Sequence, residues 1–152
     1  MSTEIQRPVL ATFCARLQEP RRFLQVVAGP RQVGKTTLVR QALAMLAQQP
    51  GKPMAQHSVS ADNPGLAGSS WLRSQWETAR ALALQAGASI LVLDEVQKLP
   101  AWTEEVKRLW DEDTRTGRDV RVVVLGSAPL LIAQGLTESM AGRFEMTRLG
   151  HW

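Results

Sequence analysis

A run of eight residues near the N-terminus has the spacing of a phosphate-binding loop. Glycine lets a backbone curl so that successive N–H groups point at an anion, and a helix that follows adds its positive dipole end. In such a loop a lysine ammonium suits β- and γ-phosphates, and a threonine hydroxyl suits Mg²⁺. Here the run is Gly29, Pro30, Arg31, Gln32, Val33, Gly34, Lys35 and Thr36, and Thr37 follows on the α-phosphate side. Arg31 and Gln32 are variable loop positions, which either face solvent or contact a γ-phosphate or a neighbour.

Two carboxylates, Asp94 and Glu95, end a downstream apolar stretch, residues 90–93. An aspartate at the end of a buried strand can bind Mg²⁺ directly or through a water molecule. A glutamate next to it can orient and deprotonate the attacking water. Together with the loop, this pair predicts hydrolysis of a nucleoside triphosphate. A glutamate directly after the aspartate favours the additional-strand ATPases. The chain has no Asn/Thr-Lys-x-Asp motif for reading guanine, which favours ATP.

Two further polar residues are candidates for the same chemistry. Ser127 follows an apolar segment and fits a sensor of the γ-phosphate or attacking water; it also fits a helix N-cap, and the two roles are compatible. Arg143 is a candidate arginine finger, which neutralises charge on the transferred phosphoryl group in its own subunit or in a neighbouring one. The alternative for Arg143 is a surface ion pair.

Strand-like and helix-like segments alternate along the chain, which predicts an α/β fold. We expect a three-layer P-loop NTPase with a mainly parallel five-stranded sheet, strand order 5-1-4-3-2. The fourth strand is then inserted between the phosphate-loop strand and the acidic strand. The expected strands are residues 22–28, 54–60, 89–93, 119–125 and 144–149, and the expected helices are 5–17, 35–48, 71–86, 102–113 and 129–134.

Composition limits the class of protein. With 152 residues and 44% apolar content, the chain suits a single domain over 1–152. No apolar run approaches the ~20 residues of a membrane helix, no signal peptide is evident, and a single cysteine excludes an internal disulfide. We therefore expect a cytoplasmic protein without a membrane partner. A net charge of +4, with 14 of the 18 basic residues arginine, leaves nucleic acid as a weakly supported partner.

The remaining chemistry-bearing residues favour structural roles. Cys14 is expected to be buried on a helix, and His57 and His151 have no partners at metal-ligand spacing. Four tryptophans at helical positions favour the core over base stacking. They are Trp71, Trp76, Trp102 and Trp110, whereas the acids Glu104, Glu105, Asp111, Glu112 and Asp113 are expected to form a solvated helix face.

Three runs together resemble one family. They are GPRQVGKTTL from residue 29, LDEVQKLPAW from residue 93, and residues 125–152, which include LGSAPLLI and AGRFE. The chain resembles the prokaryotic AAA-type ATPases whose members usually carry a C-terminal nuclease-like domain of unknown function. The resemblance implies phosphate and Mg²⁺ roles for Lys35 and Thr36, metal and water roles for Asp94 and Glu95, a sensor at Ser127 and a finger at Arg143. Gln97 belongs to the family signature without an assigned role.

The resemblance also sets expectations about what this sequence lacks. The helical lid and C-terminal domain of such ATPases have no counterpart before Trp152. We therefore expect weak affinity, little discrimination of the base, and slow turnover. The leading hypothesis is Mg²⁺-dependent ATP binding and hydrolysis. The alternatives are an ATP-binding switch or truncated module with little turnover, and a nucleic-acid-associated accessory protein; a homo-oligomer or the missing C-terminal domain is a possible partner.

Overall fold

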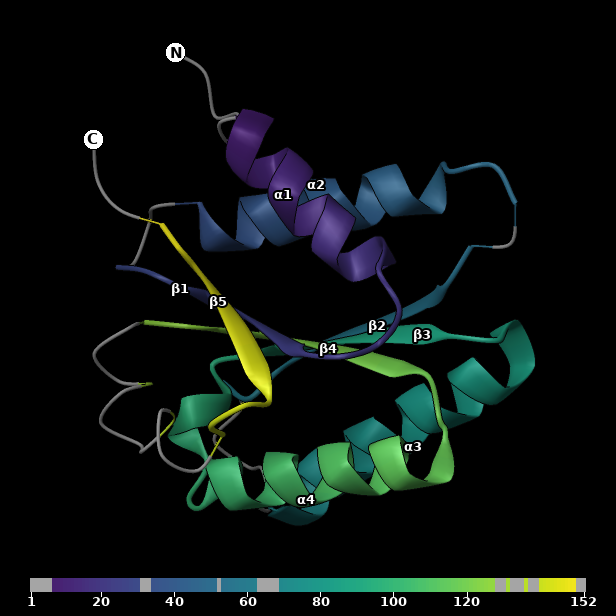
Figure 1. The fold of residues 1–152 in the computed structure, drawn as a ribbon. Coiled ribbons are helices and arrows are strands. Elements are labelled where there is room, and N and C mark those ends of the chain that lie inside the picture. Colours follow the sequence, from purple (N-terminus) through teal and green to yellow (C-terminus); the bar gives the residue numbers. More distant parts are fainter. Residues whose placement is uncertain are drawn as a thin grey trace.

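Five strands pair in parallel through the middle of the molecule (Figure 1). The computed structural model describes residues 7–30, 34–51, 53–62, 69–127, 131, 136 and 140–149. All five residues of β1 are buried, as in a strand covered on both faces. The strands are β1 (Leu24–Ala28), β2 (Ala55–Ser60), β3 (Ser89–Asp94), β4 (Val120–Gly126) and β5 (Phe144–Arg148).

The strand order is β2-β3-β4-β1-β5, and every neighbouring pair is parallel. This is the expected order read from the other edge, so the predicted topology is confirmed. β4 lies between the strand that precedes the phosphate loop and the strand that ends in the two acids. Because all strands run the same way, their carboxyl ends share one edge of the sheet, which is where ligands bind in open α/β sheets.

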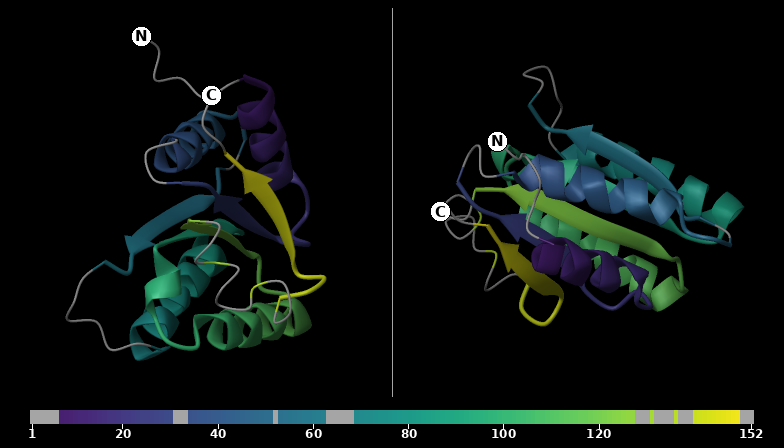
Figure 2. Two further views of the ribbon diagram at one scale, coloured as in Figure 1. Left: turned by 90° about the vertical axis from the view of Figure 1, so that its left-hand side faces the viewer. Right: turned by 90° about the horizontal axis from the view of Figure 1, so that it is seen from above.

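Helices cover both faces of the sheet (Figures 1 and 2). On one face lie α1 (Arg7–Gln18) and α2 (Lys35–Ala47), and on the other lie α3 (Ser69–Ala86) and α4 (Trp102–Thr116). The expected helices agree with these within a few residues, and a short 3₁₀ helix, η1 (Val96–Lys98), was not predicted. Most of the expected helix over 129–134 lies outside the described residues, although Leu131 is helical.

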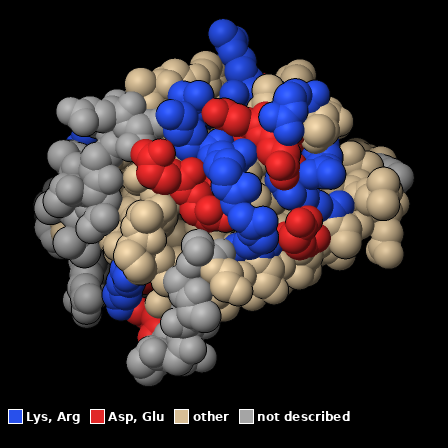
Figure 3. Space-filling model, turned by 90° about the horizontal axis from the view of Figure 1, so that it is seen from below, with Lys and Arg blue, Asp and Glu red and all other residues tan. Residues whose placement is uncertain are grey.

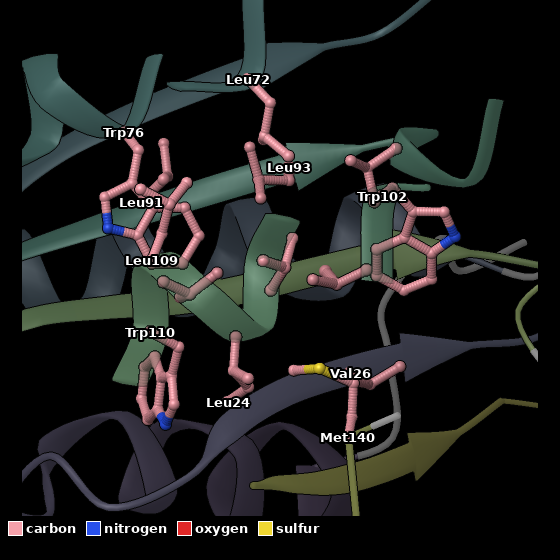
Figure 4. Close-up of a cluster of buried hydrophobic side chains, with 14 of the residues drawn as sticks. Leu24, Val26, Leu72, Trp76, Leu91, Leu93, Trp102, Leu109, Trp110 and Met140 are labelled. Atoms are coloured by element: carbon pink, nitrogen blue, oxygen red, sulfur yellow. The ribbon is translucent and has the colours of Figure 1, made fainter. Parts of the chain in front are cut away.

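Two apolar cores hold these layers together. The larger packs α3 and α4 against the sheet, and its side chains interlock in Figure 4. The smaller packs α1 and α2 against the opposite face and includes the buried Cys14. The tryptophans belong to the larger core, as expected: Trp76, Trp102 and Trp110 are buried, and Trp71 packs against them partly exposed.

The prediction of a solvated acidic face on α4 is wrong for Asp113. Asp113 is completely buried and accepts hydrogen bonds from the indole N–H of Trp76 at 2.7 Å and from Arg80 Nε at 2.8 Å. A charged group enters a core when a paired guanidinium and hydrogen bonds replace its hydration. This cluster ties α4 to α3.

The outer surface of α3 and α4 carries both signs of charge in alternation (Figure 3). Its ion pairs include Arg73 with Glu105 and Arg118 with Glu112. Interleaved charges of both signs do not make the continuous basic stripe of a nucleic-acid-binding surface. This face therefore adds no support to the nucleic-acid hypothesis.

The buried cluster predicts a large cost for one substitution. Asp113→Ala removes the acceptor of Arg80 Nε and of the Trp76 indole N–H. We expect it to lower the free energy of unfolding by about 3 kcal/mol, because two buried donors lose their acceptor at ~1–3 kcal/mol each, while Arg80 keeps its ion pair with Glu112. Urea denaturation measures the loss. Asp111→Ala is the control on the same helix: the Asp111 side chain is 43% exposed and its ion pair is superficial, so it should cost at most ~1 kcal/mol. Equal losses would contradict the role given to burial.

Candidate nucleotide-binding site

The carboxyl ends of three neighbouring strands bring most of the predicted site residues to one edge of the sheet. Ala28 at the end of β1 is in register with Gly126 of β4, and Leu125 of β4 is in register with Asp94 of β3. Hydrogen bonds fasten the segments that follow: the Gly29 N–H donates to the Gly126 carbonyl at 3.3 Å, and the Glu95 N–H donates to the Leu125 carbonyl at 3.1 Å. The phosphate loop and the acidic pair therefore flank the end of β4.

The end of the phosphate loop has the backbone for which a glycine is suited. Gly34 caps α2 in the left-handed region at φ 92°, and its carbonyl accepts the first helical hydrogen bond from Leu38 at 2.8 Å. The Lys35 ammonium donates to the carbonyl oxygens of Gly29 at 2.6 Å and Pro30 at 3.0 Å, so it reaches back across the loop. The first turn of α2 carries no acid to offset the dipole.

Three predicted loop residues, Arg31, Gln32 and Val33, lie outside the described residues. Of the two threonines after the lysine, Thr36 is exposed and Thr37 is half-buried in the first turn of α2. Thr36 is therefore accessible from solvent at the start of α2.

A cleft of about 280 Å³ opens between α2 and the ends of β2 and β3, and Thr36 and Asp94 both line it. The predicted metal pair thus shares one cavity. Its other walls were not foreseen from the sequence, because their side chains come from α2 and three different strands. They are Val39, Arg40, Leu43, Ser58, Val59, Ser60, Val92 and Leu125.

Negative charge is concentrated around Asp94. Burial raises the pKa of the Asp94 carboxyl above its ordinary value, and the carboxylates of Glu95 and Asp62 raise it further. The Lys35 ammonium and a backbone hydrogen bond from Glu95 act in the opposite direction. A cation beside Asp94 would relieve this crowding. Asp62 was not among the predicted site residues, and its place beside the site follows from its position just after β2, a strand parallel to β3.

Glu95 has an unusual backbone for a residue with a side chain. Its φ is 60°, in the left-handed region, and such strain collects at functional sites. Oε1 of Glu95 accepts a hydrogen bond from Gln97 Nε2 at 2.8 Å, and Oε2 lies 3.8 Å from Lys98 Nζ. Lys98 also forms an ion pair with Asp62. The contact with Gln97 was missed from the sequence, although its spacing of two residues beyond Glu95 was visible.

Ser127 follows β4 directly and stands between the phosphate loop and Glu95 in strand order. Its carbonyl accepts a hydrogen bond from the Leu131 N–H at 3.0 Å, the spacing of a helical turn. This bond agrees with the helix N-cap interpretation. The sensor role of Ser127 stays a prediction.

Arg143 is not brought to this edge. It precedes β5, and its carbonyl accepts a hydrogen bond from the N–H of Leu24 at the start of β1, so it lies at the amino ends of the strands. Its guanidinium makes a two-pronged ion pair with Asp111 at 2.8 and 2.9 Å. An arginine finger acting in its own subunit is therefore wrong for this structure. The surface ion pair is present, and a finger supplied to a neighbouring subunit stays a prediction.

No second chemical centre emerges among the described residues. They contain no group of three or more histidine, cysteine, aspartate or glutamate side chains arranged to hold a metal. His57 Nε2 lies 2.9 Å from Gln75 Oε1, and Cys14 is buried with its pKa raised by that burial. Within the described helices, none has the length and apolarity needed to cross a membrane.

Comparison with known proteins agrees with this geometry. The profile of a family described as an AAA domain matches residues 21–151. The chain belongs to this AAA domain family. Uncharacterised proteins of Mycobacterium tuberculosis and Mycobacterium bovis are each 31% identical to this AAA domain over 124 residues, which cover 82% of the chain and 24% of the relative. The chain thus spans about a quarter of the length of the curated relatives it matches. Family membership implies nucleotide binding.

The charge crowding in this AAA domain predicts that Asp94→Asn stabilises the fold without metal. A carboxyl whose pKa is raised in the folded state opposes folding while it is ionised, and the penalty disappears as the pH falls through that pKa. At pH 7 in EDTA we therefore expect a higher Tm for Asp94→Asn than for the parent, and the difference should shrink on acidification. Asp111→Asn, which loses an attractive ion pair, should not raise the Tm. A lower Tm for Asp94→Asn would contradict the crowding.

Proposed function

We propose that this AAA domain binds Mg²⁺-ATP and hydrolyses it to ADP and phosphate. One observation carries the proposal: the end of β4 is flanked by the phosphate loop with Lys35 on one side and by Asp94 and Glu95 on the other. A cation for phosphate, an oxygen ligand for metal and a base for water are the three parts that phosphoryl transfer to water requires. The phosphate loop follows β1 and the two acids end β3, with β4 between these strands. This arrangement agrees with the additional-strand ATPases.

The ammonium of Lys35 already lies across the mouth of the loop, held by two carbonyl oxygens. Phosphate oxygens carry full charge and make stronger hydrogen bonds than carbonyls. We propose that the β- and γ-phosphates take over the Lys35 ammonium, while the amide groups at the start of α2 bind the same phosphates. ATP selectivity over other nucleoside triphosphates rests on the sequence argument alone.

The donor set fits Mg²⁺. Thr36 and Asp94 offer a hydroxyl and a carboxylate from opposite walls of one cleft, and the crowding of acids around Asp94 favours a divalent cation. Mg²⁺ keeps most of its waters and uses few protein ligands beside phosphate oxygens, so two such residues suffice. When bound, the ion supplies charge neutralisation at the phosphates.

Glu95 is proposed as the base. Its carboxylate takes a proton from water as the water oxygen forms a bond to the γ-phosphorus, and the bond from that phosphorus to the bridging oxygen of ADP breaks. Ser127, at the end of β4, is proposed to contact the γ-phosphate or the attacking water. The proton leaves Glu95 to solvent afterwards, which restores the site.

The phosphate-binding role of the loop is tested by Lys35→Ala. Charge-assisted contacts to phosphate contribute ~1.5–3 kcal/mol, so Mg²⁺-ATP affinity should fall tenfold or more while the fold is kept. Titration calorimetry measures the affinity, and circular dichroism checks the fold. Lys107→Ala, which removes a lysine from α4, is the matched control and should bind like the parent. Unchanged affinity in folded Lys35→Ala would place the phosphates elsewhere.

The proposed base is tested by Glu95→Gln. The amide keeps the shape but accepts no proton, so the hydrolysis rate should fall by about 10²–10⁴-fold, with Mg²⁺-ATP bound at least as tightly as by the parent. Release of phosphate under single-turnover conditions measures the rate, and Glu104→Gln on α4 is the control. Parental turnover in Glu95→Gln would show that another group is the base. Tight binding by a parent chain that never hydrolyses ATP would favour the ATP-binding switch instead.

A further inference from the structure

Gln97 makes the closest polar contact recorded for the Glu95 carboxylate. It lies in η1, two residues after Glu95, and its side chain is 5% exposed. Its Nε2 donates to Glu95 Oε1 at 2.8 Å. Val96 and Leu99, on either side of it in the chain, are buried in the larger core and anchor this turn. The amide therefore approaches the carboxylate from a fixed platform.

The other end of the same amide presses against β4. Gln97 Oε1 is buried and has no hydrogen-bond partner among the described residues. A Cβ on Gly126 would stand 2.7 Å from Oε1 and 3.2 Å from Cδ of Gln97, closer than packed atoms allow. The room for Gln97 thus exists because residue 126 has no side chain. Gly126 is also the last residue of β4, next to Ser127.

The second carboxylate oxygen of Glu95, Oε2, is attracted by the ammonium of Lys98. Lys98 Nζ lies 3.8 Å from Glu95 Oε2 and is paired with Asp62, away from the end of β4. Lys98 is 43% exposed, and a long ion pair with an exposed lysine fixes the orientation of a carboxylate only loosely. The hydrogen bond from buried Gln97 fixes one orientation.

We propose that Gln97 is the positioning residue of Glu95. Its amide holds Oε1, so that the remaining oxygen of the carboxylate is aimed at the attacking water, and Gly126 provides the space that the amide needs. This inference rests on the proposed hydrolysis of ATP. It assigns a role to a residue that touches neither phosphate nor metal and acts through Glu95.

Gln97→Met tests the proposal directly, because methionine has similar volume and no hydrogen-bond donor. We expect kcat for ATP hydrolysis to fall about 10- to 100-fold, the range expected when a hydrogen bond to a charged group is lost, while the Kd of Mg²⁺-ATP changes less than twofold. The chain offers a matched control in Gln25, a buried glutamine at the opposite edge that donates to Glu145 Oε1 at 2.8 Å and also has an unpartnered Oε1. Gln25→Met should keep the parental kcat.

Two further variants separate positioning from damage to the fold. In the Glu95→Gln background, Gln97→Met should lower the residual rate no further, because it acts through the missing carboxylate. Gly126→Ala should reproduce the loss in kcat by displacing the amide. Its added effect should be smaller in a Gln97→Ala background, where the two closest contacts of the new Cβ are gone and the contact with Leu131 Cδ2 at 3.3 Å remains.

The outcomes distinguish the two proposals. Hydrolysis by Glu95→Gln at the parental rate, or no hydrolysis by the parent, would overturn the proposed function and the positioning role with it. If Glu95→Gln is inactive but Gln97→Met hydrolyses ATP like the parent, the positioning role alone is overturned. It is overturned likewise if Gln97→Met and Gln25→Met lose kcat equally, or if Gln97→Met lowers the rate further in the Glu95→Gln background.

Discussion

The placement of β4 between β1 and β3 is the constraint on which the site depends. The last residues of β4 accept hydrogen bonds from the segments that leave both neighbours, through the carbonyls of Gly126 and Leu125. These two bonds set the separation between the phosphate loop and the acidic pair. Buried backbone groups must find such partners, so the spacing is maintained by the sheet itself and not by the functional side chains. The side chains of the site are then free to serve chemistry.

Much of the fold was predictable because it follows from local apolar patterns. The three central strands, β1, β3 and β4, are short runs rich in valine, leucine and isoleucine. The Asp94–Glu95 pair indicated that a strand is inserted, which fixed the strand order. Asp113 shows where residue type misled. It lies three residues after Trp110 and seven after Val106, within the buried stripe of α4, so helical periodicity pointed inward while its charge suggested solvent. Its partners on α3 come from more than thirty positions away and leave no local trace.

The candidate site divides in the same way. Lys35, Thr36, Asp94 and Glu95 were predictable, because each belongs to a short motif whose backbone context is local. The roles of Gln97 and Arg143 depend on contacts that motifs do not encode. Arg143 resembled a finger by its place in the sequence, yet parallel strands carry every strand start to the edge opposite the phosphate loop. The position of the Gln97 amide depends on Gly126 of β4, and nothing in a single sequence indicates that these two residues are in contact.

The Lys35 ammonium gives the loop an internal occupant before any ligand arrives. A phosphate ligand must therefore replace the hydrogen bonds of Lys35 Nζ to the carbonyls of Gly29 and Pro30, at 2.6 and 3.0 Å. The measured affinity is the intrinsic one reduced by the fraction of time in which the ammonium is released. Replacing two carbonyl contacts by contacts to charged phosphate oxygens makes the gain in free energy a difference between two sets of hydrogen bonds, smaller than the strength of either set alone.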